Sequence, residues 1–155
     1  MKIAGRLVVS TNRRALADYF VLERLEAGVA LAGSEVKSLR AREVSFKDAY
    51  AEIEKGEVWL RNLHINPYAQ AGRYAPDPLR PRRLLLHRSE IARLLGKVQQ
   101  KGLTLIPLAI YFTQGVAKVE LGLAKGKVQY DKRRTIAERD ARRDVERALR
   151  EKQKG

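Results

Sequence analysis

The chain has 155 residues, of which 45% are hydrophobic, so it is long enough for one domain with a core of its own and too short for two. It has no cysteine and only two histidines, which excludes disulfides and thiolate metal sites and argues against a histidine-based metal centre. The net charge of +14 favours a polyanionic partner.

The first half of the chain predicts a short helix and two strands. Asn12 is a suitable N-cap in front of good helix formers, so a short helix should begin there. Residues 19–31 are rich in β formers and contain a glycine, as in a long bent strand of a small barrel. Residues 34–40 alternate roughly between polar and apolar side chains and predict a strand with one charged, solvated face. Residues 45–50 predict a single helical turn capped by a serine.

The middle of the chain predicts a hairpin followed by an irregular connection. Residues 49–61 alternate on both sides of a Lys55-Gly56 turn, which is the pattern of a β-hairpin. Residues 67–81 hold four of the five prolines and predict an irregular segment.

The last third predicts a helix and a second hairpin. Ser89 should cap a helix that Gly102 ends. Residues 103–124 form two β-rich runs around a Gln114-Gly115 turn, and Pro107 places its strand at an edge or a bulge. We therefore expect a mainly β fold, an OB-fold-like closed antiparallel barrel of five to six strands with about three short helices.

The end of the chain is a basic arm, residues 125–155, that follows the barrel of residues 1–124. The arm has twelve Lys or Arg and six Asp or Glu, a net +6 that leaves +8 on the barrel. Its sequence has high helix propensity but few large apolar residues. We expect an arm that is frayed or disordered by itself and becomes helical when a polyanion neutralises it; the alternative is a solvated helix lying on the barrel.

Candidate catalytic residues outside the arm are few. Glu35, Asp48, His64, Asp77 and His87 are the titratable side chains of interest, and none has the spacing of a metal site or a nucleophile–base pair. We expect no catalytic residues, no metal and no cofactor. No apolar run reaches the roughly 20 residues needed to span a bilayer, and the N-terminus has no secretory signal pattern, so a cytoplasmic protein is expected.

Ordered motifs along nearly the whole chain resemble one known family. These motifs are Asn12-Arg13-Arg14-Ala15, Phe20 with Glu26-Ala27-Gly28, Gly33-Ser34-Glu35-Val36-Lys37-Ser38-Leu39-Arg40, His64-Ile65-Asn66-Pro67, Asp77-Pro78 with Arg80, Arg82-Arg83-Leu84-Leu85-Leu86, Gly122-Leu123-Ala124-Lys125-Gly126-Lys127 and Tyr130-Asp131-Lys132-Arg133. In this order they are similar to the SmpB (small protein B) family, the tmRNA-binding proteins of bacterial trans-translation.

The resemblance implies a barrel that holds the tRNA-like domain of tmRNA, and an arm that contacts the decoding centre and lies as a helix in the empty mRNA channel of a stalled ribosome. An elongation factor carrying alanyl-tmRNA would be an indirect partner, and no membrane is involved. By matching position it implies tmRNA contacts at Asn12, Arg13, Glu35, Lys37, Arg40, His64 and Asn66. It implies ribosome contacts in the arm at Lys125, Lys127, Tyr130, Asp131, Lys132 and Arg133.

Two other interpretations of the residues stay open. A general single-stranded or ribosomal RNA-binding or assembly protein would use the same barrel and basic arm without preferring a tRNA-like fold. A divalent-metal nuclease would use Glu35, Asp48 and His64, and RNA cleavage in the presence of magnesium would distinguish it.

Overall fold

The structure is a computed structural model that describes residues 2–3, 5–100 and 102–127. The arm residues Tyr130, Asp131, Lys132 and Arg133 lie outside the described residues, whereas Lys125 and Lys127 lie within them.

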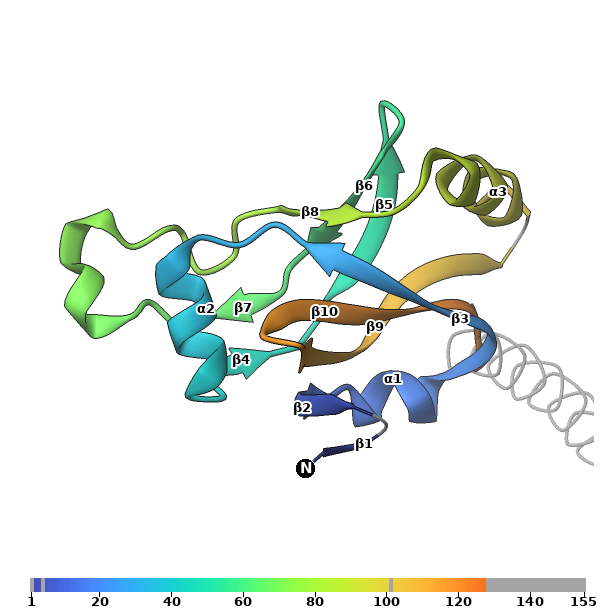
Figure 1. The fold of residues 1–155 in the computed structure, drawn as a ribbon. Helices are drawn as coiled ribbons and strands as arrows, with labels where there is room; N and C mark the ends of the chain where they lie inside the picture. The colour runs from blue at the N-terminus through green and yellow to red at the C-terminus, as the bar shows by residue number, and fades with distance from the viewer. Residues whose placement is uncertain (1, 4, 101, 128–155) are drawn as a thin grey trace, which may run out of the picture.

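Six antiparallel strands form a closed barrel (Figure 1). They are β3 (Tyr19–Val29), β5 (Tyr50–Glu54), β6 (Glu57–Arg61), β8 (Arg82–Leu85), β9 (Leu103–Thr113) and β10 (Val116–Gly126). Their hydrogen-bonded order is β9-β10-β3-β8-β6-β5, and the pairing of Ala51 with Leu105 joins β5 back to β9. The predicted closed antiparallel barrel of five to six strands is confirmed.

Among the described residues, four short strands lie outside this ring. They are β1 (Lys2–Ile3), β2 (Arg6–Thr11), β4 (Val44–Ser45) and β7 (His64–Ile65). β2 pairs with the second half of β9, and β1 extends β2, whereas β4 and β7 pair with each other. None of the four was predicted, because three of them have only two residues and carry no periodic signal. The fourth, β2, has a single buried residue among its six.

The part of the chain that the structure describes has three α-helices and one 3₁₀ helix beside the strands, and the prediction of about three short helices is confirmed. They are α1 (Arg13–Asp18), α2 (Gly33–Arg40), α3 (Arg88–Val98) and η1 (Ala69–Tyr74). The long strand from Tyr19 is also confirmed, as are both hairpins, whose turn residues Lys55-Gly56 and Gln114-Gly115 all have positive φ.

The predicted strand over residues 34–40 is wrong, because this segment is helix α2. Its two large apolar residues, Val36 and Leu39, are three apart and pack on the core together, with Leu39 fully buried. That spacing places them on one face of a helix and on opposite faces of a strand. The Glu35 carboxylate also accepts a hydrogen bond from the Ala32 backbone N–H at 2.9 Å, which satisfies a free donor at the start of α2.

Two local predictions around helix ends are also wrong. Residues 45–50 form no helical turn, since Ser45 ends β4 and Asp48 sits in a tight turn with φ of 62°. Helix α3 has His87 instead of Ser89 at its N-cap, and it ends at Val98 with Gln99, not Gly102, at its C-cap.

The proline in β9 lies at a bulge, as predicted. Leu121 pairs with Pro107 while Glu120 pairs with Ala109, so Leu108 has no partner on β10. The side chain of Leu108 folds over Gly122, which leaves no room for a side chain there. This bulge belongs to the tightly packed seam between the last two strands of the barrel.

Candidate nucleic-acid interface

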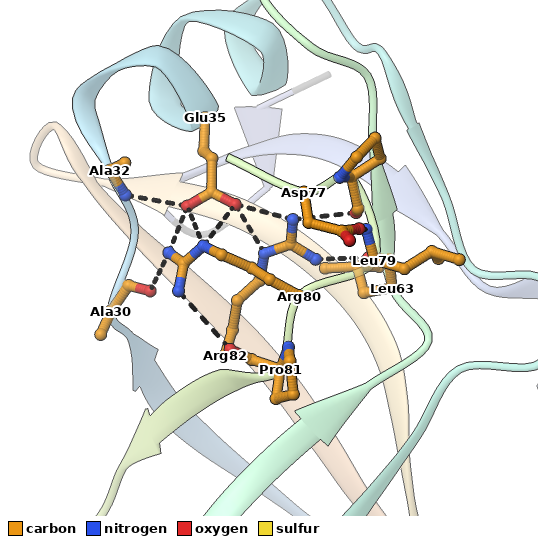
Figure 2. Close-up of polar contacts among 10 residues, drawn as sticks. Ala30, Ala32, Glu35, Leu63, Asp77, Leu79, Arg80, Pro81 and Arg82 are labelled. Carbon is orange, nitrogen blue, oxygen red and sulfur yellow. Dashed lines mark hydrogen bonds and ion pairs between the residues drawn. The ribbon is translucent and has the colours of Figure 1, made fainter. Parts of the chain in front are cut away.

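A buried ion-pair network joins helix α2 to the start of strand β8 (Figure 2). The Glu35 carboxylate accepts from Arg82 Nε at 2.8 Å and from Arg80 Nε at 3.1 Å. Arg82 is fully buried and also donates to the backbone oxygens of Leu63 and Pro78. Arg80 also donates to Ala30 O at 3.3 Å. Through its two arginines the Glu35 carboxylate therefore links α2 to the backbone at Ala30, Leu63 and Pro78.

The protonation of this network follows from its surroundings. Burial disfavours ionisation of Glu35, but hydrogen bonds from Arg80, the Ala32 N–H and Arg82 outweigh burial and hold the pKa of the carboxyl below its usual range. Burial lowers the pKa of Arg82, and the hydrogen bond to Glu35 opposes that change. Arginine still keeps its proton at any physiological pH, so the network is ionic.

The outer face of α2 carries two of the predicted RNA-binding cations. Lys37 and Arg40 are exposed, and each lies over an aromatic ring: Lys37 Nζ is 5.3 Å from the Tyr68 ring centroid and Arg40 Cζ is 4.4 Å from that of Phe112. Contact with an aromatic face orients a cation while leaving its charge available to a phosphate. The aromatic contacts therefore orient Lys37 and Arg40 on the outer face of α2, and the buried ion pairs of Glu35 hold the helix itself in place.

His64 and Asn66 lie beside α2. His64 belongs to β7, which contacts α2, and it is half-buried where it pairs with Ser45. Asn66 is exposed, and its backbone N–H donates to Glu43 O at 3.0 Å. The structure thus brings five of the seven predicted tmRNA-binding residues to one region, although one of them, Glu35, is buried.

The other two predicted residues start helix α1, which packs against β9 and β3. Asn12 is buried: its Oδ1 accepts from the Ala15 N–H at 3.2 Å and its Nδ2 donates to Pro107 O at 2.8 Å. Arg13 is exposed on the first turn of the helix. Asn12 therefore fixes the start of α1 through buried hydrogen bonds. Of these two predicted residues, only Arg13 is exposed to solvent.

Strand β10 runs directly into the predicted arm. Its last residues, Lys125 and Gly126, pair with Phe20 and Tyr19 of β3, two residues past the boundary expected at 124. Lys127 Nζ then lies 5.0 Å from the centroid of the Phe20 ring, which is 56% exposed. The first basic residues of the arm are thus fixed by the barrel.

An array of charged side chains on β2, β3 and β10 was missed by sequence reasoning. Glu120 binds Arg6 at 2.9 Å and Arg24 at 2.8 Å, and the Tyr111 hydroxyl donates to Glu26 at 2.6 Å. Arg24 and Glu26 belong to a run of alternating exposed residues on β3, which is the signal in the sequence for a charged strand face. Their partners, Glu120 and Tyr111, come from strands far along the chain, so the sequence alone does not show the pairing.

The described residues contain no group of three His, Cys, Asp or Glu side chains that could hold a metal ion. Glu35, which a nuclease would use as a metal ligand, instead forms ion pairs with Arg80 and Arg82. Among the helices of the described ranges, none is long and apolar enough to cross a membrane.

Comparisons with known proteins give a consistent family. A family model described as SmpB protein matches residues 9–151. The SsrA-binding protein of Desulfitobacterium hafniense (strain DSM 10664 / DCB-2) is 59% identical over 155 residues, which cover 100% of this chain and 99% of the relative. That of Moorella thermoacetica is 60% identical over 148 residues, covering 95% and 96%.

A solved structure also matches. It is described as "tmRNA-SmpB: a journey to the center of the bacterial ribosome", is 57% identical, has a TM-score of 0.66, and is matched over 80% of this chain and 85% of the solved chain. On this evidence the chain belongs to the SmpB protein family.

Proposed function

We propose that this protein binds the tRNA-like domain of tmRNA and delivers it to stalled ribosomes in trans-translation. The observation that carries the proposal is the 59% identity over the full chain to a protein named SsrA-binding protein. The solved tmRNA-SmpB structure, at 57% identity, supports both tmRNA and the ribosome as partners.

The proposed tmRNA surface is centred on helix α2. Lys37 and Arg40 supply exposed charge for phosphates, and His64 and Asn66 supply hydrogen-bonding groups beside them. Glu35 acts through its ion pairs, which fix α2 in place. Arg13 adds a cation on α1, where Asn12 holds the helix by its cap.

The proposed ribosome-binding part is the basic arm. Lys125 and Lys127 begin it, and the motif Tyr130-Asp131-Lys132-Arg133 continues it. Its net charge of +6, counted from the sequence, suits an RNA-walled channel, where counterion release would favour binding. In this proposal the barrel holds tmRNA, and the arm probes the decoding centre and the empty mRNA channel.

The proposal describes a non-enzymatic protein that works in the cytoplasm, where bacterial ribosomes translate. An elongation factor carrying alanyl-tmRNA is an indirect partner. Recognition and positioning suffice for this role, and it calls for no cofactor.

A competition gel-shift at fixed, near-physiological salt tests the proposal. Labelled tmRNA is bound to the full chain and displaced with unlabelled tmRNA, an ordinary tRNA or an unstructured RNA of equal length. We expect tmRNA to compete at a concentration at least about tenfold lower than either of the others, since specific sites exceed non-specific binding well beyond that. Equal competition by all three RNAs would instead identify a general RNA-binding or ribosome-assembly protein.

A further inference from the structure

A groove of about 540 Å³ lies between helix α1 and the turn at residues 46–49. This volume is within the range of about 300–1,000 Å³ that is usual for small-molecule sites. Its lining includes Ala15 and Ile106, which are 6% and 3% exposed. The α1 groove, as we name it, therefore has a firm apolar base, and it shares no cation with the α2 surface.

Two aromatic side chains line the α1 groove from different chain segments. Tyr19 comes from the junction of α1 and β3, and Phe46 from the turn that follows β4; both are half-buried. Half-buried rings in an open groove present surface on which an unpaired base can stack.

The α1 groove is lined by two charged side chains that form an ion pair with each other and by two that do not. Arg14 and Asp18 form an ion pair at 3.5 Å. Lys47 and Asp48 are exposed, and within the described part of the chain neither side chain has an ion pair or hydrogen bond. The groove thus offers one cation and one carboxylate that are not committed to the fold.

The turn that carries these two groups is fixed by its backbone. Asn62 Nδ2 donates to Asp48 O at 3.2 Å, and the Ala49 N–H donates to Phe46 O at 2.8 Å. The Lys47 N–H donates to Ser45 Oγ at 3.3 Å. The backbone of Asp48 is therefore held in place, although its carboxylate forms no hydrogen bond or ion pair within the described part of the chain.

We propose that the α1 groove binds one unpaired guanine nucleotide of an RNA. Tyr19 and Phe46 provide the stacking surface, Asp48 accepts hydrogen bonds from the guanine N1–H and exocyclic amine, and Lys47 binds the phosphate. A carboxylate has two acceptors and no donor, and guanine is the base that presents two adjacent donors on its Watson–Crick edge. The other bases place an acceptor beside each donor, and a carboxylate would repel it.

The inference rests on the proposed function only in assigning the nucleotide to an RNA, so its first test uses no RNA. The ¹⁵N-labelled full chain is titrated with GMP, IMP and AMP at constant ionic strength, and amide shifts are followed by NMR. IMP lacks the exocyclic amine, so GMP should bind more tightly than IMP, and AMP should bind most weakly. Saturating shifts should concentrate at residues 46–49 and on α1.

Variants separate the roles of the two groups. Asp48→Asn is suited to the positive φ of 62°, and it should weaken GMP binding at least about fivefold and remove the preference over IMP. Glu43→Gln, an exposed acid outside the groove, should change neither. Lys47→Ala should weaken all three nucleotides equally, whereas Lys97→Ala on α3 should have no effect. Equal binding of the three nucleotides, shifts elsewhere, or an Asp48→Asn chain that binds GMP normally would overturn the proposal.

Two further readouts identify the RNA. If Asp48→Asn weakens tmRNA in the gel-shift, the guanine belongs to tmRNA; if tmRNA binding holds but peptide tagging on stalled ribosomes falls, it belongs to ribosomal RNA. No change in either would overturn the assignment to RNA. Failure of the proposed function is distinct, because it would appear as a wild-type chain with no preference for tmRNA.

Discussion

Arg82 and Glu35 form an ion pair that is closed to solvent: Arg82 Nη2 lies 2.7 Å from Glu35 Oε2, and the two side chains are 0% and 4% exposed. Arg82 begins β8 and Glu35 lies in the first turn of α2, so the pair ties a helix to the barrel wall. Arg80, 32% exposed, binds the same carboxylate. Glu35 therefore fixes, through both arginines, the helix that carries Lys37 and Arg40.

The first prediction concerns the stability that Glu35 provides. Glu35→Ala leaves Arg82 buried without a counter-charge, so the free energy of unfolding should fall by about 3–5 kcal/mol. Urea unfolding at pH 7, followed by circular dichroism, measures it. Glu43→Ala, at an exposed acid, is the matched control and should stay within about 0.5 kcal/mol of wild type. A Glu35→Ala loss as small as that of the control would contradict the assigned role.

The second prediction gives the pH dependence of the same pair. The pKa of Glu35 is lowered in the folded protein, so its contribution is fully present above the unfolded pKa of about 4.3 and is lost as pH falls through the folded pKa. The difference in unfolding free energy between wild type and Glu35→Gln should therefore be constant near neutral pH and shrink below about pH 4. Urea titrations at several pH values measure this difference, and one that grows on acidification would show the opposite shift.

The barrel was predictable because its strands carry local signals. Alternation around the Lys55-Gly56 and Gln114-Gly115 turns fixes two hairpins, and Pro107 marks a bulge that the register confirms. Closure through a single pairing of Ala51 with Leu105 depends on how the sheet coils. No local pattern encodes that contact.

The candidate site was harder to predict, because its geometry depends on distant partners. The rough alternation of residues 34–40 predicts a strand, although the three-residue spacing of Val36 and Leu39 favours a helix face. Glu35 was identified as a residue of interest, but its partners lie 45 and 47 residues away. Sequence spacing alone therefore could not show that its carboxylate is buried between two arginines.

The third prediction tests the close packing at the bulge of β9. A Cβ on Gly122 would lie 2.8 Å from Leu108 Cδ1 and 3.1 Å from its Cγ, so Gly122→Ala should destabilise the fold by about 1–3 kcal/mol. Gly96→Ala in α3 has open space around its Cβ and should stabilise by about 0.5–1 kcal/mol. Thermal and urea unfolding of both variants measure the contrast. A Gly122→Ala chain as stable as wild type would show that Leu108 moves aside without cost.

The fourth prediction tests the α2 surface. Lys37→Ala should weaken tmRNA binding several-fold and reduce the slope of log K against log salt by about 0.7–0.9, the value for one phosphate contact. Gel-shift titrations at three or more salt concentrations measure both quantities. Lys37→Arg keeps the charge and should keep the slope, and Lys97→Ala on α3 should match wild type. An unchanged slope for Lys37→Ala would remove this residue from the proposed site.

The fifth prediction separates the barrel from the arm. The cut belongs after Lys127, because β10 pairs with β3 through Gly126 and Lys127 contacts the Phe20 ring; a cut after residue 124 would remove part of the strand. The truncated chain should bind tmRNA within about twofold of the full chain, since the proposed tmRNA surface on α2 and α1 is intact, yet peptide tagging on stalled ribosomes should be lost. A chain with residues 128–155 in scrambled order keeps the net charge but not the Tyr130-Asp131-Lys132-Arg133 motif, and it should fail as well. Tagging restored by the scrambled arm would show that charge alone is sufficient, whereas normal tagging by the truncated chain would mean that the arm has no part in ribosome engagement.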